Sequence, residues 1–275
     1  MKDTAAGTSW TDETFSGDKR IFWPEYRPTL EDDDISSDVY NIEWRRIRDQ
    51  YGDSDSYSMW GYNGISFADP RQGSIGDCWM IAASSVAAQH PDRIKEIFEV
   101  EDLNYAGVYA VKLYIMGIPV TVTIDDYLPF RKFSNELLYS KKGPDNALWM
   151  PILEKAAAKL YGNYEFLEGG NIGPAVQALT GAPFYDVDNN DMGVDELWEY
   201  IDSHLKDGDM LSCSSHVNTG NDRDTNSIGV PNRHAFTING TVKLSDGTKL
   251  VRIRNPWGSE YYHGDWSDSS YKWNE

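Results

Sequence analysis

The sequence predicts an α+β fold in two parts, and three patterns support this prediction. A run of small and apolar residues directly after Cys78 is typical of a buried helix. An Ala-rich stretch near 151–161 predicts a second helix. Segments 234–238 and 251–255 instead alternate between apolar and polar side chains, as strands with one buried face do. The first part is therefore expected to be mostly helical and the second part β-rich.

Three stretches divide the chain. Residues 1–58 are polar and are expected to form an irregular N-terminal extension. Residues 59–181 form the part that carries Cys78, and residues 182–275 form the part that contains the later strands. The turn at 179–182 is the expected hinge between these two parts.

Shorter elements are expected within these stretches. Segments 21–24 and 42–44 of the extension carry aromatic residues that can anchor it to the body of the protein. Segments 108–113 and 120–124 predict a short strand pair. Segment 194–206 predicts a helix ahead of the later strands.

Composition sets outer limits on function. With 275 residues, 40% of them hydrophobic, the chain can bury one large core or two smaller ones. A net charge of −19 repels nucleic acid and anionic membranes, so we expect no nucleic-acid partner. Acidity also fits calcium binding, although solvated loops are the ordinary explanation of a single acidic run such as 31–34.

Cysteine usage and hydropathy indicate a compartment. The two cysteines, Cys78 and Cys213, are too few for a disulfide framework. Residues 1–20 lack a basic start followed by an apolar stretch, so we expect no signal peptide. No window approaches the ~18 apolar residues of a membrane span. These features together predict a cytoplasmic protein.

Residues 72–79, Gln-Gly-Ser-Ile-Gly-Asp-Cys-Trp, place a cysteine where a glycine-rich turn becomes a helix. The N–H groups and the positive end of the helix dipole at this position favour a negative sulfur. The pKa of the Cys78 thiol should therefore fall below its usual ~8.5, which would make it a nucleophile. An isolated cysteine at a helix start is more often a small buried residue, so a base must also be found.

Two later segments supply a histidine and a polar partner. A turn at 229–232 leads into the strand that begins with His234, and a proline directly after Asn255 stops a second strand. A hairpin turn is predicted between them at 245–247. Neighbouring antiparallel strands would bring His234 and Asn255 close enough for a side-chain hydrogen bond.

Together these segments resemble the protease core of the calpains, cysteine endopeptidases with a papain-like arrangement. The family's blocks Q-G-x-x-G-D-C-W, G-H-A-[FY] and R-N-P-W-G have counterparts at residues 72–79, 233–236 and 254–258, in the same order. A fourth stretch, 148–170, is also similar, and the likeness covers residues 59–270. The resemblance implies a papain-like fold in which a mostly helical, Cys-bearing subdomain and a β-rich, His/Asn-bearing subdomain form a cleft.

Carried over to this sequence, the resemblance makes Cys78 the nucleophile, His234 the general base and Asn255 the residue that orients the imidazole. Gln72 would donate to the oxyanion together with the Cys78 backbone N–H, and losing one such donor costs about 3 kcal/mol of transition-state stabilisation. Trp257 would cover the hydrogen bond between His234 and Asn255 and keep water away from it.

One residue departs from the family inside a motif. Arg233 stands before the histidine, where the family usually has glycine. An arginine at this position would either crowd the cleft or recognise an acidic substrate, and the sequence leaves both readings open.

The resemblance also implies a calcium site without an EF-hand. Asp69 and Glu165 match its carboxylate positions, and Tyr62 and Gly64 match its backbone carbonyls. The alternative is that Asp69 caps a turn and Glu165 is solvated. A stretch that begins at Asp188 resembles an EF-hand loop, but methionine at its fifth position supplies no oxygen ligand, so we reject it.

A second calcium site of the family is expected to be incomplete. Asp268 matches one of its acidic positions, whereas Tyr261 occupies another and Glu260 is displaced by one residue. We therefore expect one calcium ion per chain, held in the Cys78-bearing part.

The remaining candidates have ordinary structural explanations. Cys213 lies on an apolar strand pattern without a histidine motif, and Gly73 and Gly76 lack the spacing of a nucleotide-binding loop. The other histidines lack the strand-and-turn context of His234, so surface or packing roles are expected for them. They are His90, His204, His216 and His263.

The sequence thus predicts a calcium-dependent cysteine endopeptidase that performs limited proteolysis of intracellular proteins through a thioester acyl-enzyme. Its expected partners are unstructured segments of protein substrates, together with possible accessory domains or regulatory partners outside this chain. Two alternatives remain. One is a catalytically silent, calcium-dependent interaction module of the same fold, and the other is a transglutaminase-type acyltransferase.

Overall fold

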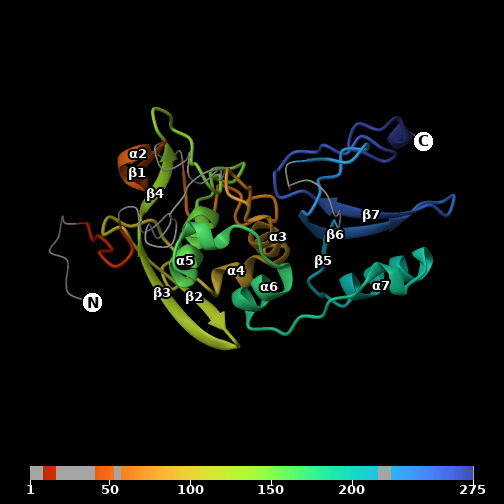
Figure 1. Cartoon of the computed structure of the whole chain (residues 1–275), viewed down its shortest axis with the longest axis horizontal. Helices are drawn as coiled ribbons and strands as arrows, with labels where there is room; N and C mark the ends of the chain where they lie inside the picture. The colour runs from red at the N-terminus through yellow and green to blue at the C-terminus, as the bar shows by residue number, and fades with distance from the viewer. Residues whose placement is uncertain (1–8, 17–40, 53–56, 216–223, 275) are drawn as a thin grey trace, which may run out of the picture.

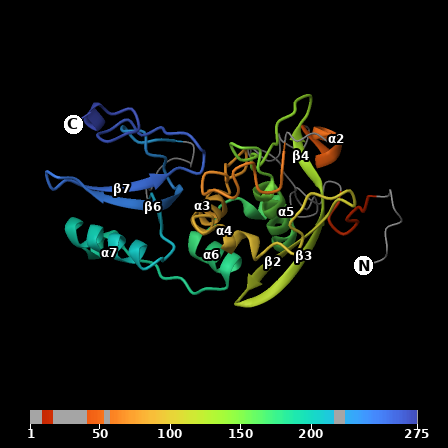
Figure 2. The same ribbon diagram turned by 180° about the vertical axis from the view of Figure 1, so that it is seen from behind.

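The structure, a computed structural model, describes residues 9–16, 41–52, 57–215 and 224–274. Its elements form two bodies that lie side by side in both views (Figures 1 and 2). The first body contains most of the helices, and the second contains a three-stranded sheet and one long helix. The aromatic segment 21–24, the acidic run 31–34 and His216 lie outside the described residues.

Helices form the centre of the first body. α3 is buried along its whole length, and its small side chains let α6 pack closely against it. α5 is likewise buried over its first ten residues. Both helices were predicted, α3 directly at Cys78. The helical elements of this body after residue 57 are α3 (Cys78–Ala87), α4 (Pro91–Lys95), α5 (Trp149–Tyr161), η3 (Tyr164–Leu167) and α6 (Ile172–Thr180).

Two antiparallel strand pairs complete the first body. β2 (Val108–Ile115) and β3 (Ile118–Asp125) form the predicted pair and are joined by a tight turn. β2 is longer than predicted at its C-terminal end, and β3 is longer at both ends. β1 (Ile42–Arg46) pairs with β4 (Tyr127–Arg131). A short helix, α2 (Ile47–Tyr51), follows β1 directly.

The prediction of an irregular extension is wrong for residues 42–51, which form β1 and α2. The expected aromatic anchor is confirmed at Trp44, whose ring lies 6.1 Å from that of Tyr164. Arg46 forms a buried ion pair with Asp126 at 2.5 Å, so a residue that looked polar and solvated in the sequence holds β1 to the body. The partner lies far along the chain, and sequence alone did not reveal it.

The second body is built on the order β5–β6–β7, with both pairs antiparallel. The strands are β5 (Ser212–Ser214), β6 (Ala235–Lys243) and β7 (Lys249–Arg254). The predicted hairpin turn is confirmed, and Gly247 adopts φ +94° there, a conformation that favours glycine. The predicted helix is α7 (Val194–Lys206), and two short helices complete this part, η4 (Asn189–Asp191) and η5 (Tyr271–Asn274).

Polar contacts join the two bodies. From β6, the Thr237 hydroxyl donates to the Ala82 carbonyl of α3 at 3.0 Å. The Gln89 amide just after α3 donates to the Ile238 carbonyl at 3.1 Å. These bonds place the first strand after His234 directly against the helix that begins at Cys78.

The predicted α+β class is confirmed, since the described chain contains both helices and antiparallel sheets. Each of the two bodies contains both kinds of element. Gly181 ends α6 in the left-handed conformation at φ +72°, where the hinge was expected. The hinge itself and the subdomain limits 59–181 and 182–275 stay predictions. Within the described ranges, no helix combines the length and hydrophobicity of a transmembrane segment.

Candidate active site

Cys78 is the first residue of α3, as the sequence predicted. The Asp77 carbonyl accepts the backbone N–H groups of Met80 and Ile81, at 2.9 and 3.1 Å, and so closes the first turn. The first residue of a helix has no intrahelical acceptor for its own N–H. Cys78 therefore presents a thiol and a backbone donor from one buried position at the positive end of a helix dipole.

Gln72 lies in a tight loop ahead of the nucleophile. Its side-chain amide donates to the Ile75 carbonyl at 2.8 Å, which fixes the orientation of the amide. A Cβ atom on Gly73 would lie 1.6 Å from the Tyr139 carbonyl oxygen, so only glycine fits the next position. The backbone N–H of Gln72 donates to the Pro256 carbonyl at 2.9 Å, which joins this loop to the segment after β7.

The predicted hydrogen bond between His234 and Asn255 is confirmed. His234 Nε2 lies 2.9 Å from Asn255 Oδ1. Asn255 Oδ1 also accepts the Trp257 backbone N–H at 3.0 Å, which holds the amide oxygen toward the ring. Because an amide oxygen can only accept, the imidazole proton resides on Nε2.

Aromatic rings enclose the imidazole. The Trp257 ring centroid lies 4.7 Å from that of His234, and the Phe236 ring meets His234 edge-on at 5.0 Å. His234 is 1% exposed in this setting. Trp257 thus stands where the sequence analysis placed it, beside the His234–Asn255 hydrogen bond.

The structure gives a backbone reason for the family's glycine before the histidine. Arg233 adopts φ +47°, in the left-handed region that L-residues other than glycine rarely occupy. Its side chain is exposed, while Asn232 and His234 on either side are buried. The departure from the family therefore changes local strain as well as charge.

Arg254 connects the Asn255 segment to the first body. Its guanidinium donates to the carbonyls of Ala68 at 3.0 Å and Pro70 at 2.5 Å. Burial lowers the pKa of Arg254 to about 10, and the neighbouring Arg71 charge lowers it further while Asp69 opposes this. The two carbonyls flank Asp69, so one side chain links the predicted calcium loop to the residue before Asn255.

Asp69 is buried, where it accepts hydrogen bonds and lies near a second acidic residue. Its Oδ2 accepts the Ser66 backbone N–H at 2.8 Å and the Trp149 indole N–H at 2.9 Å. Burial raises the pKa of Asp69, and the charge of Asp145 raises it further. Asp69 therefore holds a turn together, as one of the two sequence readings expected, and it also faces a second carboxylate.

Asp145 is the residue that sequence reasoning missed at this loop. Its Oδ2 accepts the Asn63 backbone N–H at 3.0 Å, and its backbone carbonyl accepts the Tyr62 N–H. Its Oδ1 is buried and accepts no hydrogen bond from the described part of the chain. A Gly-Pro-Asp-Asn turn gives no signal of a ligand, so only the fold places this carboxylate beside residues 62–64.

Glu165 and Asp268 come from later segments. Asp69 contacts Trp149, the first residue of α5, whereas Glu165 lies on η3, which follows that helix, and its role as a ligand stays a prediction. Asp268 is exposed near the end of the chain, where its backbone N–H donates to the Glu260 carboxylate. Among the described residues, no three His, Cys, Asp or Glu side chains gather into a metal cluster.

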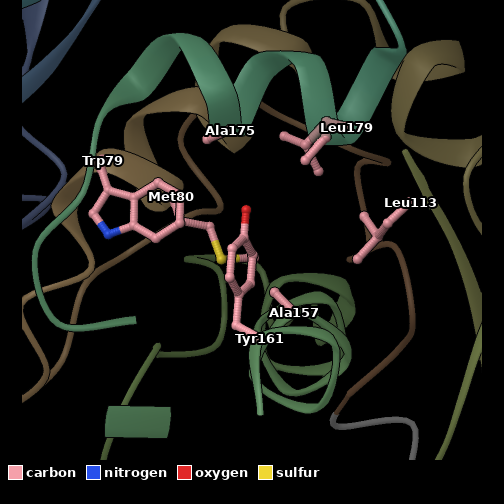
Figure 3. A pocket seen from close by; sticks show the side chains of 8 residues that line it. Trp79, Met80, Leu113, Ala157, Tyr161, Ala175 and Leu179 are labelled. Carbon is pink, nitrogen blue, oxygen red and sulfur yellow. The ribbon is translucent and has the colours of Figure 1, made fainter. Parts of the chain in front are cut away.

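A small cavity lies inside the first body, and none of the predicted catalytic residues lines it (Figure 3). Its volume is about 10 Å³, which is at the lower limit for one water molecule. The Tyr161 hydroxyl points into it, and apolar side chains surround it. The lining residues are Trp79, Met80, Leu113, Ala157, Tyr161, Ala175, Ala178 and Leu179.

Cys213 lies on β5, on the strand predicted for it. Burial raises the pKa of the Cys213 thiol to about 12. A thiol with such a pKa is almost entirely protonated at neutral pH and is a poor nucleophile.

A cysteine that opens a helix, an amide donor before it, and a histidine oriented by an asparagine are together typical of the cysteine peptidases with a papain-like arrangement. Comparison with known proteins agrees. The family model described as "Calpain family cysteine protease" matches residues 10–275 of this chain. The chain therefore belongs to the calpain family of cysteine proteases.

Curated relatives are about one-third identical to this chain over the aligned region. It is 34% identical over 277 residues to "Calpain-type cysteine protease ADL1" of Oryza sativa subsp. japonica, which covers 97% of this chain and 12% of that protein. It is 32% identical over 252 residues to "Calpain-1 catalytic subunit" of Mus musculus, and the match covers 87% of this chain and 34% of that protein. It is 34% identical over 220 residues to "Calpain clp-1" of Caenorhabditis elegans, and the match covers 76% of this chain and 27% of that protein. The chain thus spans a minor part of each of these relatives.

Proposed function

We propose that this chain is a calcium-dependent cysteine endopeptidase that performs limited proteolysis of intracellular proteins in the cytoplasm. The observation that supports the chemistry best is the 2.9 Å bond between His234 Nε2 and Asn255 Oδ1. It orients the imidazole and leaves Nδ1 as the nitrogen that exchanges a proton. The contacts of β6 with α3 hold the strand that follows His234 against the helix that begins with Cys78.

In the proposed reaction, His234 Nδ1 takes the thiol proton and the Cys78 thiolate attacks the peptide carbonyl carbon. The Cys78 backbone N–H and the Gln72 amide donate hydrogen bonds to the resulting oxyanion. The amine leaves with the proton from His234, and a thioester to Cys78 remains. Water, deprotonated by His234, hydrolyses this thioester and releases the second product.

The residues of the Asp69 loop fit a calcium ion. Asp69 and Asp145 face each other, the buried Oδ1 of Asp145 receives no hydrogen bond from the described residues, and the Tyr62 and Gly64 carbonyls belong to the same loop. Such a set of hard oxygen atoms suits calcium. Bound there, calcium would supply the positive charge that offsets the two carboxylates. Arg254 would then hold the neutralised loop against the Asn255 segment.

The experiment that tests activity is cleavage of an unfolded protein substrate with calcium, with chelator, and with Cys78→Ala. We expect cleavage only with calcium and the intact thiol. Equal cleavage rates with chelator and with calcium would show a constitutive protease and would remove calcium from the proposal.

Calcium titration calorimetry then identifies the ligands. Asp145→Asn should weaken calcium binding, because it removes the buried oxygen charge beside Asp69. Glu165→Gln is the matched test of the position implied by the family resemblance, and this residue lies on η3, after α5. A loss of binding in Glu165→Gln with none in Asp145→Asn would contradict this ligand set. Asp268→Ala should leave the single binding event unchanged.

Thiol labelling separates the two cysteines. We expect iodoacetamide to modify Cys78 much faster than Cys213 at neutral pH, because burial raises the pKa of Cys213 to about 12. Peptide mass mapping after short exposure measures both rates in one sample. Equal rates under conditions that support activity would refute the assignment of Cys78 as the reactive thiol.

A further inference from the structure

Two carboxyl groups meet in the interior directly behind the nucleophile. Asp77, the residue before Cys78, is completely buried. Glu154, from the middle of α5, is 1% exposed. The two carboxyl groups lie close enough for one of them, when protonated, to donate a hydrogen bond to the other. Neither residue belongs to the reaction described above.

Few hydrogen-bond donors reach this pair. The Ser140 backbone N–H donates to Glu154 Oε1 at 2.8 Å. Apart from its own backbone N–H and Glu154, Asp77 receives no donor from the described residues. Glu168, on the segment after η3, faces Asp77 and adds a further negative charge. Two ionised carboxylates in contact without a cation are too costly in such a site, so the pair must retain a proton.

The pair is coupled mechanically to the nucleophile. The Asp77 carbonyl closes the first turn of α3, but its side chain makes no capping bond to that helix and turns to Glu154 instead. Cys78 contributes both the thiol and an oxyanion donor. A small displacement of Asp77 would therefore move both groups relative to the substrate, and misplacement by about 1 Å can cost 100-fold in rate.

We propose that Asp77 and Glu154 are positioning residues, and that the single proton they share ties the start of α3 to α5 and holds Cys78 in its reactive position. The proposal rests on the proposed function in that Cys78 is taken as the nucleophile. No described contact places either carboxyl group against the His234–Asn255 pair. The effect of Asp77 and Glu154 on catalysis therefore acts through Cys78.

The titration behaviour of the pair agrees with a shared proton. Burial raises the pKa of Asp77 to about 7, and burial and the Asp77 charge raise the pKa of Glu154 well above its usual range. The unfolded chain releases both protons near pH 4. The pair's contribution to the free energy of unfolding is therefore largest below about pH 4 and falls as the pH rises toward 7.

Variants of Glu154 test the tie by kinetics. Glu154→Gln keeps an N–H donor for the Asp77 carboxylate, whereas Glu154→Ala leaves that carboxylate buried and unpaired. We expect Glu154→Ala to lower kcat at least tenfold with KM changed less than twofold, and Glu154→Gln to restore most of the loss. Glu168→Gln is the control, because it removes a facing charge without touching the shared proton, and its kcat should stay within twofold of the wild type.

The pH dependence of Cys78 alkylation distinguishes positioning through a shared proton from a purely structural role. In the wild type, the rate of alkylation by iodoacetamide should show a step near pH 7, where the pair changes charge, beside the titration of the thiol itself. Asp77→Asn should remove this step. Glu154→Gln should shift it, because Asp77 stays buried and still titrates but has lost its carboxyl partner, and Glu168→Gln should keep it.

A wild-type kcat in Glu154→Ala, or an unchanged alkylation profile in Glu154→Gln, would overturn the proposal. If Glu154→Ala fails to fold, the profiles of Glu154→Gln and Asp77→Asn decide the matter. If the wild type cleaves no substrate, the proposed function fails, while the alkylation rates still report on the pair.

Discussion

The body that carries Cys78 and the body that carries His234 are held together in different ways. Every residue of α3 is buried, whereas Trp198 is the buried residue of α7. Val242 and Ile253 on the hairpin of the second body are about half exposed. The first body therefore has an extensive core of its own, and the second depends more on its contacts with the first.

Ion pairs show the same contrast. In the first body, Lys155 and Asp125 form a pair without any solvent exposure. In the second body, Lys249 pairs at 3.0 Å with Asp195 and Glu199, whose side chains are largely exposed. Solvent screens the latter pairs and leaves them little stabilising effect. In the proposed catalytic site, a nucleophile on the firmly packed body would act with a base on a less strongly supported sheet.

The largest expected effect tests whether both bodies are equally necessary for catalysis. Cys78→Ala and His234→Ala should each lower kcat by at least about 1,000-fold, and Asn255→Ala should cost less because it orients the base without transferring a proton. Initial rates on an unfolded protein substrate measure this, with urea unfolding as the control for folding. A His234→Ala variant that keeps a tenth of the activity would refute the shared site.

The buried ion pair should set the stability of the first body. Lys155→Met leaves Asp125 buried without its cation and should destabilise the protein by about 3–5 kcal/mol. The matched change in the second body, Lys249→Met, should alter stability little, since its partners are exposed. Urea unfolding of both variants makes the comparison. Equal losses would show that the two bodies are stabilised alike.

Arg254 tests how far the second body depends on the first. Arg254→Ala removes charged hydrogen bonds to the Ala68 and Pro70 carbonyls and should lower kcat/KM about tenfold to 100-fold, a loss of roughly 1.5–3 kcal/mol. Arg252→Ala, two residues earlier on β7, removes an exposed guanidinium that stacks on Phe67 and should cost less than twofold. Similar losses in the two variants would argue against a specific link at Arg254.

Arg233 should produce the smallest effect. Arg233→Gly relieves a left-handed residue, which costs about 1–2 kcal/mol, although the added flexibility of the unfolded chain offsets up to about 1 kcal/mol. We expect a net stabilisation of about 1 kcal/mol or less by thermal unfolding. Arg233→Ala removes the charge but keeps the strain, so only this variant isolates recognition of acidic substrates. Destabilisation by Arg233→Gly would show that the side chain has a structural partner.

Local patterns were sufficient to predict the local structure around the proposed reactive residues. The helix start at Cys78 and the hairpin that joins His234 to Asn255 depend on glycine turns, a proline stop and short-range periodicity, all of which are visible in a few residues. The limits of α7 were likewise predicted from its own segment. The β1 strand was missed, because the residues that hold it lie elsewhere in the chain.

The sequence by itself thus predicted a nucleophile, a base and a residue that orients the base, and the structure confirms the helix start at Cys78 and the bond between His234 and Asn255. Only the tertiary structure placed Asp145 beside Asp69 and Asp77 against Glu154, and only it showed Arg254 reaching a carbonyl 184 residues away. In the sequence, each of these charged residues resembles a solvated one. Whether a charge is buried, and which groups then offset it, depends on partners that meet only when the chain folds.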